Sequence, residues 1–407
     1  MTPTALTTAR ARNIPELLQI HLEELEFLWA RRRIAPGSRE LTARDYTELN
    51  ERVEAHIQGL LAVRDALPAL LVQRLAEGER DAIFAAACPL LRLNDRALAE
   101  IVIQRFATAE GEVLAGLRDA LSVAPSSQTL TAMQSQFDSA DAPHAVAAAV
   151  VLANQRLLKP TAARLGALLR ESDPAVAQFA WLAATCADVR DPAALPERPF
   201  REALEHESPQ VRGAALRAAA WTGQDWTVPA AIEFAQQGDQ VALAWLAALG
   251  AVDDFPVLHP LILKAPGAED RCALLSRCGH PAALDQVVGW LEAEDLALAA
   301  AAGEAFTRIT GADVRGHRKT MPVAPDADDF AKEFAPDVWI PDPAKAQAYL
   351  KRYGAIIATG TRWRAGVDVG GECTPEALAR VDLEARWDMC ARAALARAPT
   401  VPPPPIH

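Results

Sequence analysis

Aromatic side chains are scarce in this sequence. They make up 6% of its 407 residues, with only three Tyr, while alanine supplies much of the 51% hydrophobic fraction. Strands favour aromatic and β-branched side chains, whereas alanine has the highest helix propensity. The composition therefore favours helices over sheets, and its apolar content excludes a wholly disordered chain.

An excess of positive charge is also missing. Asp and Glu total 53 against 41 Lys and Arg, so the formal net charge is −12. Proteins that bind nucleic acid or anionic lipid rely on Lys and Arg to neutralise phosphates. We therefore expect no nucleic-acid partner and no membrane partner, and the charge favours a basic protein partner through electrostatic steering.

Cysteine is too sparse for a disulfide framework. The chain has six cysteines and no Cys-x-x-Cys pair. Cys272, Cys278 and His280 come nearest to a metal-binding cluster, but their spacing matches no standard zinc pattern. We interpret the thiols as buried or incidental, and we expect no metal ligand and no cofactor.

Long apolar runs are absent as well. The longest spans residues 145–153, well short of the roughly 18 residues that a membrane-spanning helix needs. The first ten residues lack the apolar core of a secretory signal. These absences predict a soluble, cytoplasmic protein.

Residues 1–68 are expected to form an N-terminal helical cap. A second helix should begin after Thr42, with Asp45 completing an imperfect capping box, and reach about residue 66. The first helix, residues 14–33, carries an amphipathic stripe of Leu17, Leu18, His21, Leu22, Leu25, Leu28 and Trp29. His21 and His56 fall on or near the apolar faces. Each is either a satisfied histidine between helices, or the two meet as a pH-sensitive contact.

Residues 69–312 are expected to form a HEAT-like helical repeat array. Short Ala- and Leu-rich helices follow similar polar starts about 30–35 residues apart, at Asp173, Ser208 and Asp239, with a fourth at Asp295. Such self-similarity indicates helical hairpins that must stack, because one hairpin cannot bury its apolar face alone. Four tryptophans recur along the array, either as core spacers or as contacts on its concave face: Trp181, Trp221, Trp245 and Trp290.

Residues 313–407 are expected to form a Pro-rich linker and a C-terminal helical region with a disordered tail. The linker, 313–343, should pack along the edge of the array. Further helices are predicted for 343–357, after Thr374, and for 382–397, with a short extended piece or hairpin at 361–371. The tail, Pro402-Pro403-Pro404-Pro405, should be extended polyproline, either disordered or a short ligand for a partner.

The predicted fold class is therefore all-α: a HEAT-like α-solenoid with an N-terminal helical pair and a small, mostly helical C-terminal region. Its polar starts followed by Ala-rich helices resemble HEAT-like repeats. Three further stretches carry a likeness over most of the chain: residues 21–29 with 49–60, residues 305–311, and residues 339–387. Through them the chain resembles an uncharacterised bacterial HEAT-like repeat family associated with type VI secretion gene clusters. The resemblance implies a link to secretion machinery or its effectors, and it assigns no catalytic residues.

Catalytic motifs are hard to find. His206-Glu207 is the only His-Glu pair, whereas iron hydroxylases built from such repeats use several, and HEAT-type glycosylases need a basic groove. Phycobilin lyases also contain HEAT-like repeats, and their activity needs a pigment-binding groove, which a sequence does not reveal. The nucleophile elbow, the phosphate loop and His-Glu-x-x-His are all missing. We expect no catalytic residue, so an enzyme built on the HEAT fold is the less favoured alternative.

Two tryptophans lie outside the repeats, in Pro- and Gly-rich surroundings. Trp339 and Trp363 are either buried against the last repeat or exposed to a partner, and Arg362 and Arg364 flank Trp363 with a local basic spot or ordinary surface charge. We take all four as candidate partner-binding residues.

The most favoured function is a non-enzymatic protein-protein interaction scaffold that binds through the concave face of its array. The resemblance implies a type VI secretion accessory protein that acts as effector adaptor or chaperone, with an effector or spike component as its partner. The alternative is an immunity protein that binds and neutralises a toxin.

Overall fold

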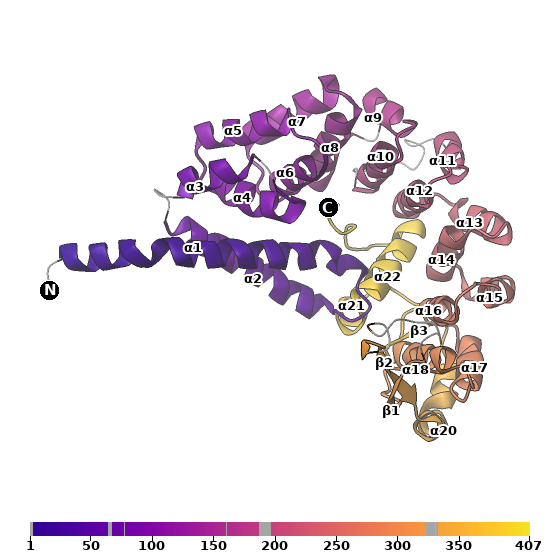
Figure 1. The fold of residues 1–407 in the computed structure, drawn as a ribbon. Coiled ribbons are helices and arrows are strands. Elements are labelled where there is room, and N and C mark those ends of the chain that lie inside the picture. The colour runs from indigo at the N-terminus through magenta and orange to yellow at the C-terminus, as the bar shows by residue number, and fades with distance from the viewer. Residues whose placement is uncertain are drawn as a thin grey trace. The chain divides into compact units, whose positions relative to one another are not determined.

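The computed structural model describes residues 3–63, 67–76, 78–159, 161–186, 197–322, 330 and 333–407. Over these residues the backbone is mainly helical, with two short two-stranded sheets (Figure 1). The predicted all-α, solenoid-like class is confirmed. The chain forms two compact units: unit 1 is Met1–Thr222 with Pro402–His407, and unit 2 is Gly223–Val401.

Unit 1 consists of consecutive helices and one extended segment. The helices are α1 (Pro3–Ile34), α2 (Ala43–Leu61), α3 (Leu67–Arg74), α4 (Arg80–Arg92), α5 (Arg96–Phe106), α6 (Gly111–Val123), α7 (Ser127–Ser139), α8 (Ala142–Asn154), α9 (Ala163–Leu168), α10 (Pro174–Cys186), α11 (Glu197–Leu204) and α12 (Pro209–Trp221). The extended segment is Pro402–His407, which we call the tail segment.

The helices of unit 1 stack in two layers. In one layer α4 packs on α6, α6 on α8, α8 on α10, and α10 on α12, while α5, α7, α9 and α11 flank them (Figure 1). The apolar run of residues 145–153 is the fully buried core of α8. No helix in the described parts of the chain combines the length and hydropathy needed to cross a bilayer.

The N-terminal pair shares its core with the first repeats. Helix α1 packs on both α2 and α4, and the Trp29 ring stacks on Phe84 of α4 at 3.5 Å between centroids. The division into two compact units, after Thr222 and after Val401, does not coincide with the predicted boundaries at residues 68 and 312, which stay predictions. Leu17 was wrongly placed in the buried stripe, because it lies on the other face of α1 and is 54% exposed.

The polar starts cap their helices as predicted, with one exception. Asp173, Asp239 and Asp295 each accept backbone N–H groups in the first turn of the following helix. Thr42 and Asp45 form a complete capping box. Ser208 makes no such bond, because its hydroxyl donates to the Gln210 side chain instead.

Unit 2 adds short strands to its helices. The helices are α13 (Thr227–Gln236), α14 (Gln240–Leu249), α15 (Phe255–Leu263), α16 (Ala268–Cys278), α17 (Pro281–Trp290), α18 (Leu296–Thr310), α20 (Pro343–Thr359), α21 (Pro375–Arg380) and α22 (Leu383–Leu395). The strands are β1 (Arg315–Thr320), β2 (Asp337–Pro341), β3 (Trp363–Arg364) and β4 (Val367–Asp368), paired as β1–β2 and β3–β4.

The β3–β4 hairpin, one of the two forms predicted for 361–371, docks against helix ends. Gly279 and Gly311 end α16 and α18 in the left-handed conformation, with φ of +62° and +73°. The carbonyl of Gly279 accepts the backbone N–H of Trp363 at 2.7 Å, and a Cβ at Gly279 would overlap the Trp363 carbonyl. These two glycines therefore let the hairpin approach the array closely.

Two predictions for residues 313–407 need correction. Residues 313–343, predicted as a linker, contain the antiparallel strand pair β1–β2. The sequence did not indicate these strands, because β1 lacks alternating apolar residues and prolines lie at the ends of β2. The tail segment is extended as expected, but it is ordered against unit 1 rather than disordered, because its backbone and side chains are held by the contacts described below.

Candidate functional site

The tail segment packs against the helices of unit 1 as an extended peptide would. Alternate positions, Pro404 and Ile406, are buried, while Pro402 and Pro405 are exposed. Ile406 is only 4% exposed. An extended chain has no internal hydrogen bonds, so its backbone groups are available to the surface that holds it.

Asn154, at the end of α8, recognises the backbone of this segment. Its carboxamide oxygen accepts the N–H of Ile406 at 2.9 Å, and its nitrogen donates to the Ile406 carbonyl, also at 2.9 Å. The same nitrogen donates to the Ser122 hydroxyl at 3.2 Å, which orients the carboxamide. The paired bonds imitate those of a neighbouring strand and require only an extended backbone at this position.

A second contact holds the carbonyl of Pro404. It accepts from the Arg217 guanidinium at 3.4 Å, and the Cys186 thiol lies 4.0 Å away. Burial lowers the pKa of Arg217 and raises the pKa of Cys186 to about 11, so the thiol stays neutral. Both contacts again address the backbone and not a particular side chain.

His407 lies at an aromatic corner of α1. Its ring meets Trp29 edge-on at 4.9 Å, and its Nε2 lies 2.9 Å from the Arg32 guanidinium. Burial, followed by the nearby guanidinium groups, holds the pKa of His407 well below its usual value. The ring is therefore neutral near pH 7 and accepts a hydrogen bond from Arg32.

Charged residues of α4 and α6 act on His407. The buried Asp119 carboxylate accepts from Arg80 at 2.8 and 3.0 Å and from Arg118 at 3.2 and 3.3 Å. Arg118 also lies over the Phe179 ring, 4.2 Å from its centroid. Two guanidinium groups on one carboxylate leave a local excess of positive charge, which contributes to keeping His407 neutral.

Three of the four predicted site residues lie elsewhere, in the interior of unit 2. Arg362 is 4% exposed, Trp363 8% and Arg364 2%. Both interpretations of Arg362 and Arg364, a local basic spot and an ordinary surface charge, are therefore wrong, because both guanidinium groups are turned inward. The Trp363 indole donates to the Ile357 carbonyl at 2.9 Å, in agreement with the burial interpretation.

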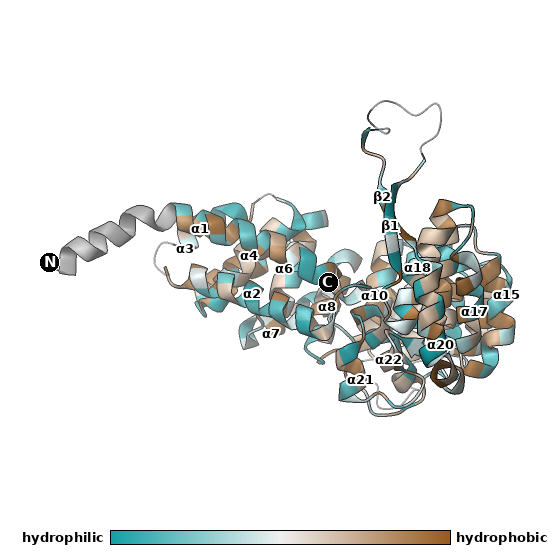
Figure 2. Cartoon of the chain, turned by 90° about the horizontal axis from the view of Figure 1, so that it is seen from below, coloured by the Kyte–Doolittle hydropathy of each residue, from teal (hydrophilic) through white to brown (hydrophobic). Residues whose placement is uncertain are grey.

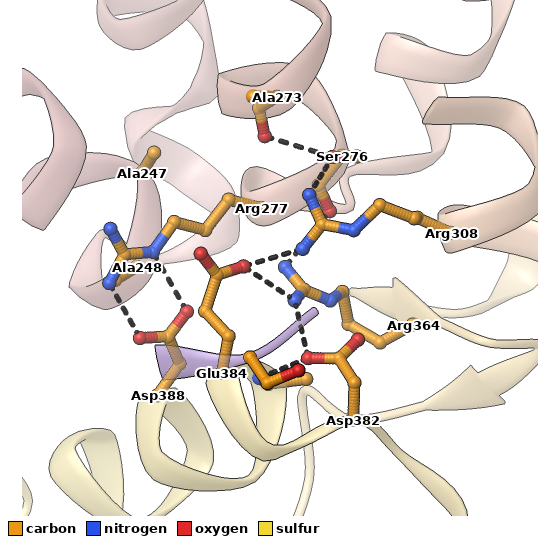
Figure 3. A network of polar contacts seen from close by, with 12 residues as sticks. Ala247, Ala248, Ala273, Ser276, Arg277, Arg308, Arg364, Asp382, Glu384 and Asp388 are labelled. Carbon is orange, nitrogen blue, oxygen red and sulfur yellow. Dashed lines mark hydrogen bonds and ion pairs between the residues drawn. The ribbon is translucent and has the colours of Figure 1, made fainter. Parts of the chain in front are cut away.

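Arg364 belongs to a charged network that fastens α22 to the array (Figure 3). Arg277 of α16 forms a bidentate pair with Asp388 at 2.8 and 2.9 Å. Arg308 of α18 and Arg364 both donate to Glu384, the latter at 3.1 Å. Asp388 beside it raises the pKa of Arg277 despite burial, so this pair remains ionised.

Two other arginines of this region donate to backbone carbonyls. Arg362 donates to the carbonyls of Ala247 and Ala248 at the end of α14, at 2.8 and 3.1 Å. Arg392 donates to Ala248 and Val369, and burial followed by the charge of Arg362 lowers its pKa to about 9. Cations at a helix C-terminus complement its dipole and satisfy its unpaired carbonyls. The role of these residues is to join the C-terminal region to the array.

Trp339 is the only one of the four candidates that is exposed, at 40%. A bulge in β1 places Arg315 and Arg318 on its face, with guanidinium carbons 5.5 and 4.9 Å from the ring centroid. Its partner-binding role stays a prediction.

Sequence reasoning missed the residues that hold the tail segment. An Asn at the end of an Ala-rich helix looks like an ordinary helix terminus, and Arg217 looks like a surface charge. The only available signal was the tail itself, for which a ligand role was one of two interpretations.

No group of three or more His, Cys, Asp or Glu in the described ranges is arranged to hold a metal ion. Cys373 and Cys390 do approach each other, with 3.8 Å between their sulfurs, and burial raises the pKa of Cys390 to about 11.

No protein-family model matches this chain, and no curated protein matches it either. The link to type VI secretion therefore stays a prediction from the resemblance.

Proposed function

We propose that this chain is a non-enzymatic protein-binding scaffold that holds an extended segment of its partner on unit 1. The observation that supports the proposal is the pair of hydrogen bonds from Asn154 to the backbone of Ile406. A surface that holds one extended segment by hydrogen bonds to its backbone can hold another segment with the same extended backbone. In this proposal the tail segment is an internal ligand that a partner replaces.

The partner segment should share the features that the tail segment presents. It needs an extended, proline-rich backbone, an aliphatic side chain at the position of Ile406, and a neutral ring acceptor for Arg32. The polyproline conformation is already extended before binding, so little entropy is lost when it docks.

A peptide with the sequence of residues 401–407, blocked at both ends and fluorescently labelled, tests this proposal by anisotropy. It should bind a chain that carries Ile406→Asp more tightly than the unchanged chain, because the weakened tail segment no longer competes. Adding Asn154→Ala should lower that affinity at least about tenfold, as expected for losing two part-buried hydrogen bonds. Adding Gln155→Ala should not, because the Gln155 side chain donates to the Ser122 carbonyl and, among the described residues, makes no hydrogen bond to the tail segment. Equal affinity for all these variants, or no binding, would contradict the proposal.

We further propose, from the resemblance, that the partner is a type VI secretion effector or spike component and that the chain acts as its adaptor or chaperone. Affinity purification from the native bacterium, followed by mass spectrometry, tests this identity. Binding to both effector and apparatus supports an adaptor. A very tight one-to-one complex that inhibits a toxin would instead establish an immunity protein.

A further inference from the structure

Helix α1 has a second apolar row besides its buried one. Ile20, Phe27 and Ile34 recur every seven residues and are 53%, 53% and 67% exposed, and Leu17 on the same face is 54% exposed. In Figure 2 the ribbon of α1 carries brown, hydrophobic residues among hydrophilic ones. A helix at the surface of a monomer has one apolar face, so a second row of large, exposed side chains indicates a contact with another molecule.

The seven-residue spacing is that of a coiled-coil seam. Two charged residues interrupt the seam on the same face, Glu24 four positions after Ile20 and Arg31 four positions after Phe27. Glu24 reaches only a loose ion pair with Arg52 at 4.0 Å, with both side chains about half exposed. The Arg31 guanidinium lies over the Phe27 ring at 5.7 Å. The seam thus carries a negative charge near its middle and a positive charge near its end.

This pattern is complementary to itself when reversed. In an antiparallel pair centred on Phe27, Ile20 faces Ile34 of the other helix, and Glu24 lies next to its Arg31. In a parallel pair, Glu24 would face Glu24 and Arg31 would face Arg31, which is repulsive. We propose that α1 pairs antiparallel with α1 of a second copy of this chain, forming a two-fold symmetric dimer.

The seam is short, which sets the strength of the dimer. Residues 17–34 cover about 25 Å of helix at roughly 1.5 Å per residue. One such helix pair buries less surface than an obligate dimer interface. The dimer is therefore reversible and depends on protein concentration.

Sedimentation velocity of the full chain, from submicromolar to high micromolar concentration, tests the proposal. The weight-average mass should rise from that of one chain to that of two. Phe27→Glu should raise the dissociation constant at least about tenfold, because two carboxylates then meet at the symmetry axis. Ile356→Glu is the matched control, since Ile356 is 58% exposed but lies on α20. A monomer at every concentration, or equal effects of the two substitutions, would overturn the proposal.

Charge reversal tests the orientation. Glu24→Arg and Arg31→Glu should each weaken the dimer, and the double variant should restore it, because the pairs are rebuilt with exchanged signs. A parallel dimer would show no such rescue and would overturn the antiparallel arrangement. Circular dichroism of each variant checks that it folds, and a chain that stays monomeric while its α1 face captures another protein would also refute self-association.

Discussion

The two units hold non-helical segments in different ways. Unit 1 holds the tail segment through one carboxamide and two guanidinium groups, which contact backbone groups and a neutral ring. Unit 2 holds the β3–β4 hairpin and α22 through ion pairs in its interior and through glycines at helix ends. The contacts in unit 1 suit a segment that another extended peptide can replace. The contacts in unit 2 suit segments that remain a fixed part of the fold. The following predictions test that difference, from the largest effect to the smallest.

Asp388→Ala should be among the most damaging single substitutions in unit 2. It leaves Arg277, whose side chain is only 19% exposed, without its bidentate partner, and breaking a largely buried pair from one side costs about 3–5 kcal/mol. Urea unfolding measures the loss. Arg198→Ala is the control, because Arg198 pairs with Glu202 on the surface with its side chain 88% exposed, and it should change the free energy of unfolding by less than about 0.5 kcal/mol. Similar losses for the two variants would show that the network is not structural.

Gly279→Ala should destabilise unit 2 by about 2–3 kcal/mol, because φ is +62° and the new Cβ overlaps the Trp363 carbonyl. Gly289→Ala, in the middle of α17, meets nothing within 4 Å and should stabilise the protein by about 0.5–1 kcal/mol. Thermal unfolding compares the two variants. Shifts in the same direction would refute the close docking of β3 against the array.

Asn154→Ala should affect the tail segment more than the rest of unit 1. The loss of two hydrogen bonds should ease local opening by about 1–2 kcal/mol. Hydrogen exchange at the Ile406 amide should therefore become roughly ten times faster. Gln155→Ala should leave this exchange rate unchanged. An equal acceleration in both variants would show that Asn154 does not specifically hold the tail segment.

Acidification should weaken unit 1 by a smaller amount. The Nδ1 atoms of His21 and His56 lie 3.1 Å apart, an approach that the absence of a side chain at Gly59 permits. Burial and the neighbouring His21 lower the pKa of His56, and His407 shifts in the same direction. Because these folded-state pKa values lie below the unfolded value of about 6.5, the stability they confer is present above that pH and is lost as the pH falls below it. Melting temperatures on either side of pH 6.5 measure the loss, which His56→Gln should reduce. A slope unchanged by that substitution would contradict the assignment.

The repeat architecture was predictable because it depends on local signals. Asp173, Asp239 and Asp295 mark helix starts by a short-range bond, and the Ala-rich runs that follow mark buried helices. The meeting of His21 and His56 was also one of two interpretations that the first helix pair allowed. The second exposed row on α1 escaped notice because Leu17 fits the spacing of the buried stripe.

The remaining features depend on contacts between residues far apart in the chain. Arg362 and Arg364 have the composition of a surface patch, and only the folded chain brings them to Ala247 and Glu384. Asn154 and Ile406 are separated by 252 positions, so no periodicity connects them. Long-range polar contacts leave no pattern in one sequence, and they decide both the interior of unit 2 and the way in which the helices of unit 1 hold the tail segment.

Hydrogen exchange of the full chain, with and without an excess of the blocked 401–407 peptide, tests the central claim most directly. We predict that the peptide accelerates exchange at Ile406 of the chain's own tail segment and leaves Trp363 and Arg364 in β3 protected. This result would show that unit 1 binds an exchangeable extended segment. Unchanged protection at Ile406 with the peptide in excess would contradict that account, because the tail segment would then be a fixed part of the fold.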